Sequence, residues 1–188
     1  MRLRYPHAVA CSRQHAVSLF ELMIVVALCA ALGVAALPAL CRQLAGVRVD
    51  SATRSLLAYL EMARAESSRR QKTVGVCRSD ASGRCAAGVL RCGAIVSSVG
   101  DWNCGWSLVI GTGTRGANVL RRHPPVSSVA IAFALAEVRF APPLGQFANR
   151  RGSISVSALS NRQSMPQVAR CIRLNQVGRP KVDRGQCR

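Results

Sequence analysis

Few residues of this sequence have the types and spacing that acid–base or nucleophilic chemistry requires. The 188 residues include 8 Asp and Glu and 3 His. His123 lies beside two prolines, and neither Asp80 nor Asp101 forms a recognisable arrangement with it. A serine–histidine–aspartate site needs a base that a third group orients. We therefore expect no enzyme activity, no catalytic residue, and no cofactor or metal.

The nine cysteines are the second group of candidates. Six of them follow residue 50: Cys77, Cys85, Cys92, Cys104, Cys171 and Cys187. An even number of cysteines in an exported domain indicates disulfides, and six cysteines allow fifteen connectivities. We favour the pairing of nearest neighbours in the sequence: Cys77–Cys85, Cys92–Cys104 and Cys171–Cys187. A zinc cluster is the alternative, but the sequence has no CxxC pair, which structural zinc sites commonly contain.

Positive charge is the strongest chemical signal. The sequence has 26 Lys and Arg against 8 Asp and Glu, a formal net charge of +18, which favours polyanions such as nucleic acid or anionic lipid. From Arg150 to Arg188 there are nine basic residues and one acid, Asp183. The candidate polyanion-binding residues in this stretch are Gly178, Arg179, Lys181, Arg173 and Arg184. Residues 179 and 181 would share a face of an extended strand. The alternative is a solvated basic rim that keeps the tail soluble.

Two further motifs carry weaker signals. Gly111 to Gly116 satisfies the pattern GxGxxG, but the long helix of a dinucleotide site cannot follow because Pro124 and Pro125 interrupt the segment. We expect a flexible loop there. Trp102 and Trp106 flank Cys104, and we expect core packing rather than stacking on nucleic-acid bases.

The N-terminal segment indicates membrane insertion. Leu22 to Cys41 is a run of twenty residues without a charge. At about 1.5 Å per residue, such a helix spans about 30 Å, the hydrocarbon thickness of a bilayer. Pro38 lies inside the run and predicts a kink. Residues 1–16 carry three arginines and no acid, which is typical of a leader retained in the cytoplasm.

A single carboxylate, Glu21, lies at the edge of this apolar run. An ionisable residue at the membrane needs a partner. Cleavage between Ala16 and Val17 would create a cationic amine four residues before Glu21, on the same chain or on a neighbour. The alternative is an acid that the helix dipole favours at a helix N-terminus.

This order of leader, small residue, acid and apolar helix resembles type IV prepilins and pseudopilins. The matching residues are Ala16, Val17, Ser18, Leu19, Phe20, Glu21, Leu22 and Met23. The resemblance implies that a prepilin peptidase cuts after Ala16 and that the new amine is methylated. It also implies that Glu21 pairs with a neighbour's N-terminus as pilin subunits assemble.

The remainder of the sequence predicts an α+β fold. Ala52, Leu56 and Leu60 lie on one helical stripe, and no Gly or Pro interrupts residues 47–72, so we expect one long helix from Val17 to about Lys72. After Lys72, about eight short β-branched segments alternate with Gly, Pro, Asn and Asp. Such a pattern favours antiparallel sheets on which the helix packs.

Four stretches sharpen the resemblance, and they occur in this order: LEMARAESSRRQKTVGVC, DWNCGWSLVIGTG, VRFAPPLGQ and CIRLNQVGRPKV. Together they resemble the GspH/FimT group of minor pilins and pseudopilins. The resemblance implies a leader at 1–16, a transmembrane and assembly segment at 17–46, and a periplasmic domain at 47–188. It also implies a single-pass inner-membrane protein that reaches the pilus or cell surface after assembly.

The same resemblance implies a function. In the FimT group a tail of the form Gly-Arg-x-Arg binds DNA for uptake; Gly178 and Arg179 match it, and Lys181 stands where Arg is usual. We therefore expect a minor pilin that binds DNA non-specifically in natural transformation. Two alternatives remain: an H-type pseudopilin of type II secretion that acts by protein contact, and a subunit that primes pilus assembly without a ligand. The sequence assigns no role to Cys29 or Cys41.

Overall fold

The computed structural model describes residues 18–92, 95–97, 101–111, 118–149, 152–160 and 163–187. The predicted leader, with its cleavage site at Ala16 and Val17, lies outside the described residues, as do most of the GxGxxG motif and Arg188. The chain divides into two compact units, residues 1–40 and residues 41–188.

The first unit contains the N-terminal part of helix α1 (Leu19–Arg70), and its described side chains are exposed. Among the described residues no single helix passes a length-and-composition test for crossing a bilayer. The segments Leu19–Val34 and Ala39–Arg70 pass it together, across the break between them. The predicted span from Leu22 to Cys41 contains this break, and Pro38 lies within it.

In the second unit, α1 presents one apolar stripe to the sheets, as the periodicity predicts. Val49, Leu56, Leu60 and Ala63 are fully buried, and they recur at the three- and four-residue spacing of one helix face. The helix ends where Gln71 takes a positive φ of 52°, because a left-handed residue cannot continue a right-handed helix. The predicted end at about Lys72 is therefore close to the observed one.

The larger sheet has five antiparallel strands, in the order β5-β4-β1-β7-β8. Their bounds are β1 (Val74–Arg78), β4 (Trp106–Ile110), β5 (Asn118–His123), β7 (Glu137–Ala141) and β8 (Gln146–Phe147). Strand β1 lies at the centre, and all five of its residues are buried. The first strand after the helix therefore lies in the middle of the sheet rather than at an edge.

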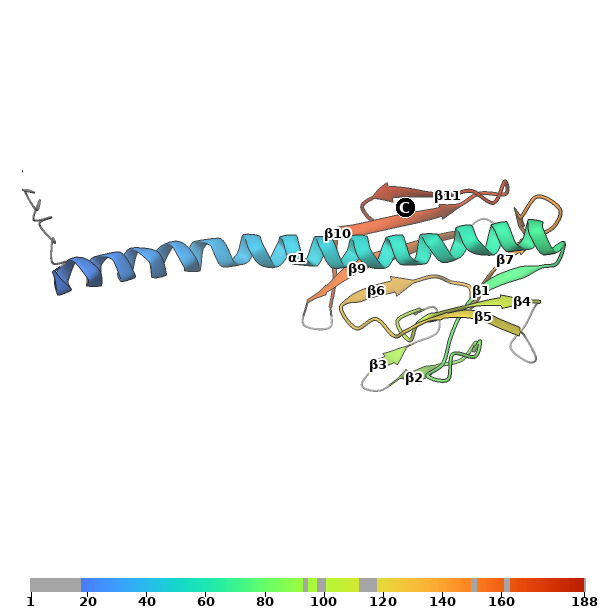
Figure 1. Ribbon diagram of the computed structural model, residues 1–188, viewed down its shortest axis with the longest axis horizontal. Coiled ribbons are helices and arrows are strands. Elements are labelled where there is room, and N and C mark those ends of the chain that lie inside the picture. Colours follow the sequence, from blue (N-terminus) through green and yellow to red (C-terminus); the bar gives the residue numbers. More distant parts are fainter. Residues whose placement is uncertain are drawn as a thin grey trace, which may run out of the picture. The chain divides into compact units, whose positions relative to one another are not determined.

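The smaller sheet has four antiparallel strands, in the order β11-β10-β9-β6. Their bounds are β6 (Val129–Ala132), β9 (Gly152–Ser160), β10 (Gln163–Leu174) and β11 (Pro180–Arg184). A separate two-stranded hairpin joins β2 (Leu90–Cys92) and β3 (Ile95–Ser97). Figure 1 shows β10 and β11, drawn in orange and red, as a hairpin at the end of the chain.

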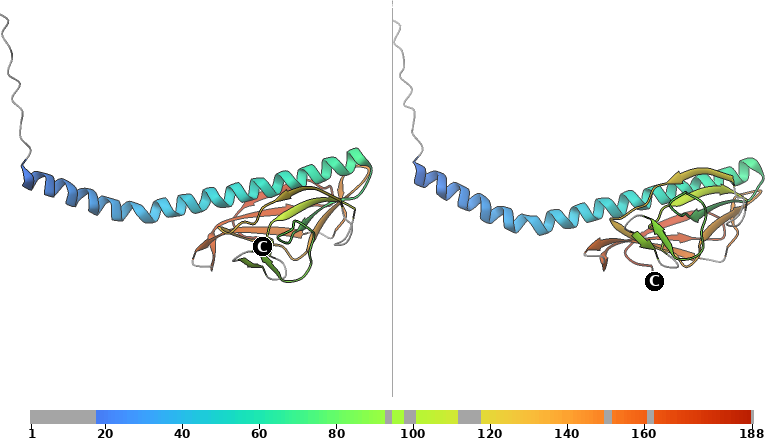
Figure 2. Two further views of the ribbon diagram at one scale, coloured as in Figure 1. Left: turned by 60° about the horizontal axis from the view of Figure 1, so that its bottom comes forward. Right: turned by 90° about the horizontal axis from the view of Figure 1, so that it is seen from below.

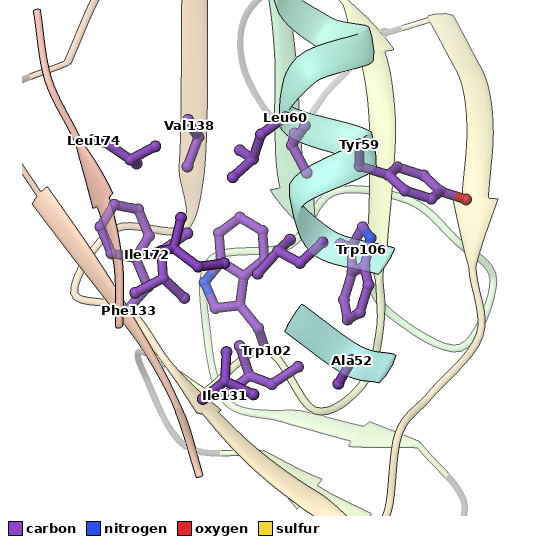
Figure 3. Close-up of a cluster of buried hydrophobic side chains, with 14 of the residues drawn as sticks. Ala52, Tyr59, Leu60, Trp102, Trp106, Ile131, Phe133, Val138, Ile172 and Leu174 are labelled. Atoms are coloured by element: carbon purple, nitrogen blue, oxygen red, sulfur yellow. The ribbon is translucent and has the colours of Figure 1, made fainter. Parts of the chain in front are cut away.

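Helix α1 crosses both sheets in the second unit (Figures 1 and 2). The main hydrophobic core joins the helix to both sheets. Figure 3 shows Leu60 from α1, Val138 from β7 and Ile172 from β10 converging there. Every residue of this core lies between Val49 and Leu174. A smaller buried cluster contains Leu90, Cys92 and Cys104. Because the second unit holds both buried clusters and the three disulfides of the described residues, we treat it as a domain that folds on its own.

The two tryptophans belong to this core, as the sequence indicates. Trp102 and Trp106 are fully buried, and the Nε1 of Trp102 donates to the carbonyl of Leu135 at 3.1 Å. Neither indole is available to stack on a nucleic-acid base. The structure confirms the predicted α+β fold, in which a long helix packs on antiparallel sheets.

Candidate functional site

The candidate site is the β10–β11 hairpin, whose turn is held by local hydrogen bonds. The amide of Gly178 donates to the carbonyl of Asn175 at 3.0 Å, and the amide of Arg179 donates to the Asn175 side-chain oxygen at 3.1 Å. Gly178 has a φ of 79°, which glycine adopts without the steric cost that other residues incur. This turn sets the register of the two strands.

The register brings two predicted cations together on one face. Arg173 lies directly opposite Lys181, and Cys171 lies opposite Asp183. Because alternate residues of a strand share a face, these four side chains project from the same side of the hairpin. We call Arg173, Lys181 and Asp183 the outer face. The side chains of Arg173 and Lys181 are 58% and 79% exposed.

Asp183 is the acid that these two cations share. Its Oδ2 lies 3.0 Å from the Nε of Arg173, and its Oδ1 lies 3.9 Å from the Nζ of Lys181. One negative charge thus faces two positive charges, so the outer face stays net positive.

The opposite face of β10 anchors the hairpin to the domain. Ile172 and Leu174 are buried in the core. The Nε of Arg170 lies 2.9 Å from the Oδ1 of Asp50 on α1. Hydrophobic burial and one ion pair therefore fix the strand that displays Arg173.

The structure separates two predicted residues from the outer face. Arg179 precedes β11, because extended pairing begins at Pro180, and it lines a cleft beside α1 instead. The prediction that Arg179 and Lys181 share a strand face is therefore not met. Arg184 pairs with Arg170, so its position alternates to the other face, although its side chain is exposed.

The structure contains three disulfides, Cys77–Cys85, Cys92–Cys104 and Cys171–Cys187. This is the pairing of nearest neighbours that the spacing favours. The third bond ties the tail after β11 back to β10, where the amide of Gly185 also donates to the carbonyl of Ala169 at 3.0 Å. Cys29 and Cys41 are free and exposed.

A second group of polar residues lies where α1 meets β5. The Tyr59 hydroxyl donates to the carbonyl of Arg122 at 2.6 Å, and the Arg121 guanidinium lies 5.6 Å from the Tyr59 ring centre. Burial raises the pKa of Tyr59, and the charge of Arg121 opposes this effect. Burial also lowers the pKa of His123, whose ring stacks on Trp106 at 3.9 Å.

Sequence reasoning did not find two residues near the hairpin, Arg64 and Glu61, which line the same cleft as Arg179. Both lie on α1, more than a hundred residues earlier in the chain, and no motif marks them. Glu21 lies in the first turn of α1 and is exposed; its role in assembly remains a prediction. Among the residues that the structure describes, no group of His, Cys, Asp and Glu could hold a metal ion.

A helix that packs on two antiparallel sheets behind an apolar N-terminal segment defines the class of minor pilins and pseudopilins. The family model for GspH, a type II transport protein, matches residues 52–178, so the chain belongs to the GspH family. Members are structural subunits of type II secretion or type IV pilus systems, and their partners are other pilin subunits. No curated protein matched the sequence.

Solved structures of the type IV minor pilin FimU from Pseudomonas aeruginosa PAO1 share the fold. One crystal form is 17% identical, covers 71% of this chain and 91% of FimU, and has a TM-score of 0.53. A second crystal form is 16% identical, covers 72% and 87%, and has the same TM-score. The resemblance confirms a pilin-like fold for this chain.

Proposed function

We propose that this minor pilin binds duplex DNA without sequence preference, through the outer face of the β10–β11 hairpin, and that this binding serves DNA uptake. The observation that supports the proposal is the pairing of Arg173 with Lys181 across adjacent strands, both exposed and opposed by one acid. Cations in this arrangement suit the phosphates of a nucleic-acid backbone, which carry no sequence information.

The hairpin is ordered before any ligand arrives. The Asn175–Gly178 turn, the Cys171–Cys187 disulfide and the buried Ile172 together fix the strands. A preorganised surface loses less conformational entropy on binding. Lys181 supplies a point charge, whereas Arg173 presents a planar fork of donors to a phosphate. Arg179 and Arg184 would add positive charge at the two ends of β11.

The N-terminal segment would place this hairpin outside the cell. We propose that a prepilin peptidase cuts between Ala16 and Val17 and that the new amine is methylated. Glu21 would then pair with the amine of a neighbouring subunit as the chain leaves the inner membrane and enters the pilus. The exposed apolar side chains of α1 from Leu19 to Leu44 support this assembly role.

A salt titration of DNA binding tests the proposal on the domain from residue 41. Fluorescence anisotropy with a random duplex should give a binding constant that falls steeply with salt. Removing Arg173 and Lys181 together (Arg173→Met with Lys181→Met) should lower the log–log slope by about 1.8, at about 0.9 for each phosphate contact. Asp183→Asn should act in the opposite direction and tighten binding, because it removes the opposing charge.

The matched control is Arg48→Met with Arg54→Met, which removes the same charge from exposed positions on α1. If the control lowers the slope equally, the DNA contact is diffuse and the hairpin is not its site. No binding at low salt would reject the proposal. If the Arg173→Met, Lys181→Met variant keeps the wild-type log–log slope, the DNA contact lies elsewhere on the domain.

A second candidate function is that of an H-type pseudopilin, which acts by protein contact in type II secretion. The family model supports it, because its description names a type II transport protein. The hairpin double variant separates the two functions in cells. If the DNA proposal is right, the double variant lowers DNA uptake and leaves secretion unchanged. If the secretion function is right, deletion of the whole chain lowers secretion, and the double variant has no effect on DNA uptake.

A further inference from the structure

A cleft of about 470 Å³ lies where α1 meets two turns of the domain. It is lined by Glu61, Arg64, Ala65, Ser68, Leu144, Arg179 and Pro180. We call it the tip cleft. We propose that the tip cleft docks an extended segment of a different pilin subunit, one that carries a carboxylate next to an apolar side chain.

Two glycines fix the walls of the tip cleft. Gly145, in the β7–β8 turn, has a φ of 63°, and a Cβ there would lie 2.6 Å from both the Cγ and the carbonyl oxygen of Arg64. Gly178, in the β10–β11 turn, would place a Cβ 2.2 Å from the carbonyl oxygen of Gly145. The amide of Phe147 also donates to the carbonyl of Gln176 at 3.3 Å. The helix and the two turns are therefore in close contact along one edge of the tip cleft.

The tip cleft combines unpaired cations with an apolar wall. Neither Arg64 nor Arg179 forms an ion pair within the described residues, and Glu61 is the only acid in the lining. Leu144 is 66% exposed, and Val177 on the neighbouring turn is 61% exposed. Leu144 therefore gives the tip cleft an exposed apolar wall beside its two cations.

This mixture favours a protein segment over nucleic acid. Phosphates and carboxylates can both accept hydrogen bonds from the Arg64 and Arg179 guanidiniums, and Glu61 repels both. Only a protein segment also gains from Leu144, because a phosphate backbone has no apolar side chain to bury there. An apolar side chain next to that carboxylate would bury against Leu144 and Pro180.

Charge also indicates which subunit supplies the segment. The chain has 26 basic residues against 8 acidic ones, so two copies would repel each other at this surface. A different subunit with an acidic segment avoids this repulsion. The tip cleft shares Arg179 with the DNA proposal but not Arg173 or Lys181, which carry that proposal. Either proposal can therefore fail while the other stands.

Nuclear magnetic resonance of the labelled domain from residue 41 tests the proposal. The probe is the peptide acetyl-Gly-Leu-Asp-Leu-Gly-amide, and its control replaces Asp with Asn. The Asp peptide should give saturable amide shifts confined to the tip cleft, including those of Arg64, Leu144 and Arg179. Loss of a charge-assisted hydrogen bond should make the Asn peptide bind about tenfold more weakly.

Matched variants identify the contacts. Arg64→Met retains the aliphatic stem that packs on Gly145 and removes the charge; together with Arg179→Gln it should weaken binding about tenfold. Leu144→Ala should weaken binding of the Asp peptide without unfolding the domain, because Leu144 is exposed. Arg173→Met with Lys181→Met should leave peptide binding unchanged.

Three results would overturn the proposal. The first is no saturable shift at the tip cleft with the Asp peptide at millimolar concentration. The second is equal binding of the Asp and Asn peptides. The third is saturation of the same amides by a duplex oligonucleotide but not by the peptide, which would make the tip cleft part of a nucleic-acid site.

Discussion

Two disulfide-tied regions of this domain place an arginine in opposite environments. In the first, Cys77–Cys85 encloses Arg78, whose side chain is 1% exposed. In the second, Cys171–Cys187 encloses Arg173, whose side chain is 58% exposed. The two arginines have the same chemistry, so the difference in burial decides that one supports the fold and the other is available to a ligand.

The surroundings of Arg78 explain why a cation is retained in the interior. Its guanidinium donates to the carbonyl of Gly88, and it lies opposite Trp106 in the central pair of strands. Burial lowers the pKa of Arg78, and the charge of Asp101 acts against this effect. The side chain therefore holds the loop after β1 against the sheet.

The largest effect that we expect is from replacing the buried arginine. Arg78→Met should lower the free energy of unfolding by about 3 kcal/mol, because it leaves the carbonyl of Gly88 and the charge of Asp101 without the guanidinium that they face. Arg173→Met should change it by less than about 1 kcal/mol, because an exposed ion pair is worth little. Denaturant unfolding of the domain from residue 41 measures both values.

DNA affinity should show the reverse order for the same two variants. Arg173→Met should weaken binding, whereas folded Arg78→Met should bind as the wild type does. Equal stability losses in the two variants would contradict the comparison. So would an Arg78→Met domain that is folded but has lost DNA binding.

The disulfides give the next largest effect. Replacing Cys171 and Cys187 with serine should lower the free energy of unfolding by about 3 kcal/mol, the chain-entropy value for a loop of about 16 residues. The same change at Cys77 and Cys85 should cost about 2.5 kcal/mol, because that loop is shorter. Thermal unfolding under oxidising conditions, with reduced wild type for comparison, measures both.

The two disulfides should differ more in their effect on DNA affinity than in their effect on the free energy of unfolding. Loss of Cys171–Cys187 frees the tail next to the outer face and should weaken DNA binding at a temperature where the variant is folded. Loss of Cys77–Cys85 should not. If both variants keep wild-type affinity, the third disulfide stabilises the fold without ordering the hairpin for a ligand.

The sequence was sufficient to predict the fold because the signals were local and strong. The stripe of Leu56, Leu60 and Ala63 sets the buried face of α1, and the short β-branched segments expected after Lys72 form antiparallel strands. The strands that it missed, β2 and β8, are short, with three and two residues. Their pairing depends on neighbouring strands rather than on their own composition.

The candidate site was predicted in part. Charge and spacing identified Arg173 and Lys181, but they could not show that Asp183 lies between the two cations. Spacing also placed Arg179 on the strand, because the point at which β11 begins depends on the turn at Gly178. Arg64 joins Arg179 only through the packing of Gly145 against α1, a contact between distant segments that no local pattern encodes.

The smallest effect is a dependence of stability on pH, and it belongs to the region around β5. The Nδ1 of His123 donates to the carbonyl of Pro124 at 2.9 Å, and the ring stacks on Trp106 beneath Tyr59 and Arg121. Burial lowers the pKa of His123, the bond to Pro124 opposes this effect, and the charge of Arg121 adds to it. The folded domain therefore binds a proton at His123 less readily than the unfolded chain does.

The sign of the pH effect follows from linkage. The contribution of His123 to stability is fully present above its unfolded pKa of about 6.5, and it is lost as pH falls from there toward the lower folded value. The melting temperature of the wild type should therefore fall more between about pH 7.5 and 5.5 than that of His123→Phe, which retains an aromatic ring against Trp106. Arg173→Met with Lys181→Met should follow the wild-type curve, because no histidine lies among the described residues of the hairpin. If the melting temperatures of the wild type and His123→Phe fall in parallel, burial does not lower the pKa of His123. Of Arg78 and His123, only Arg78 would then be a cation-forming side chain whose burial affects stability.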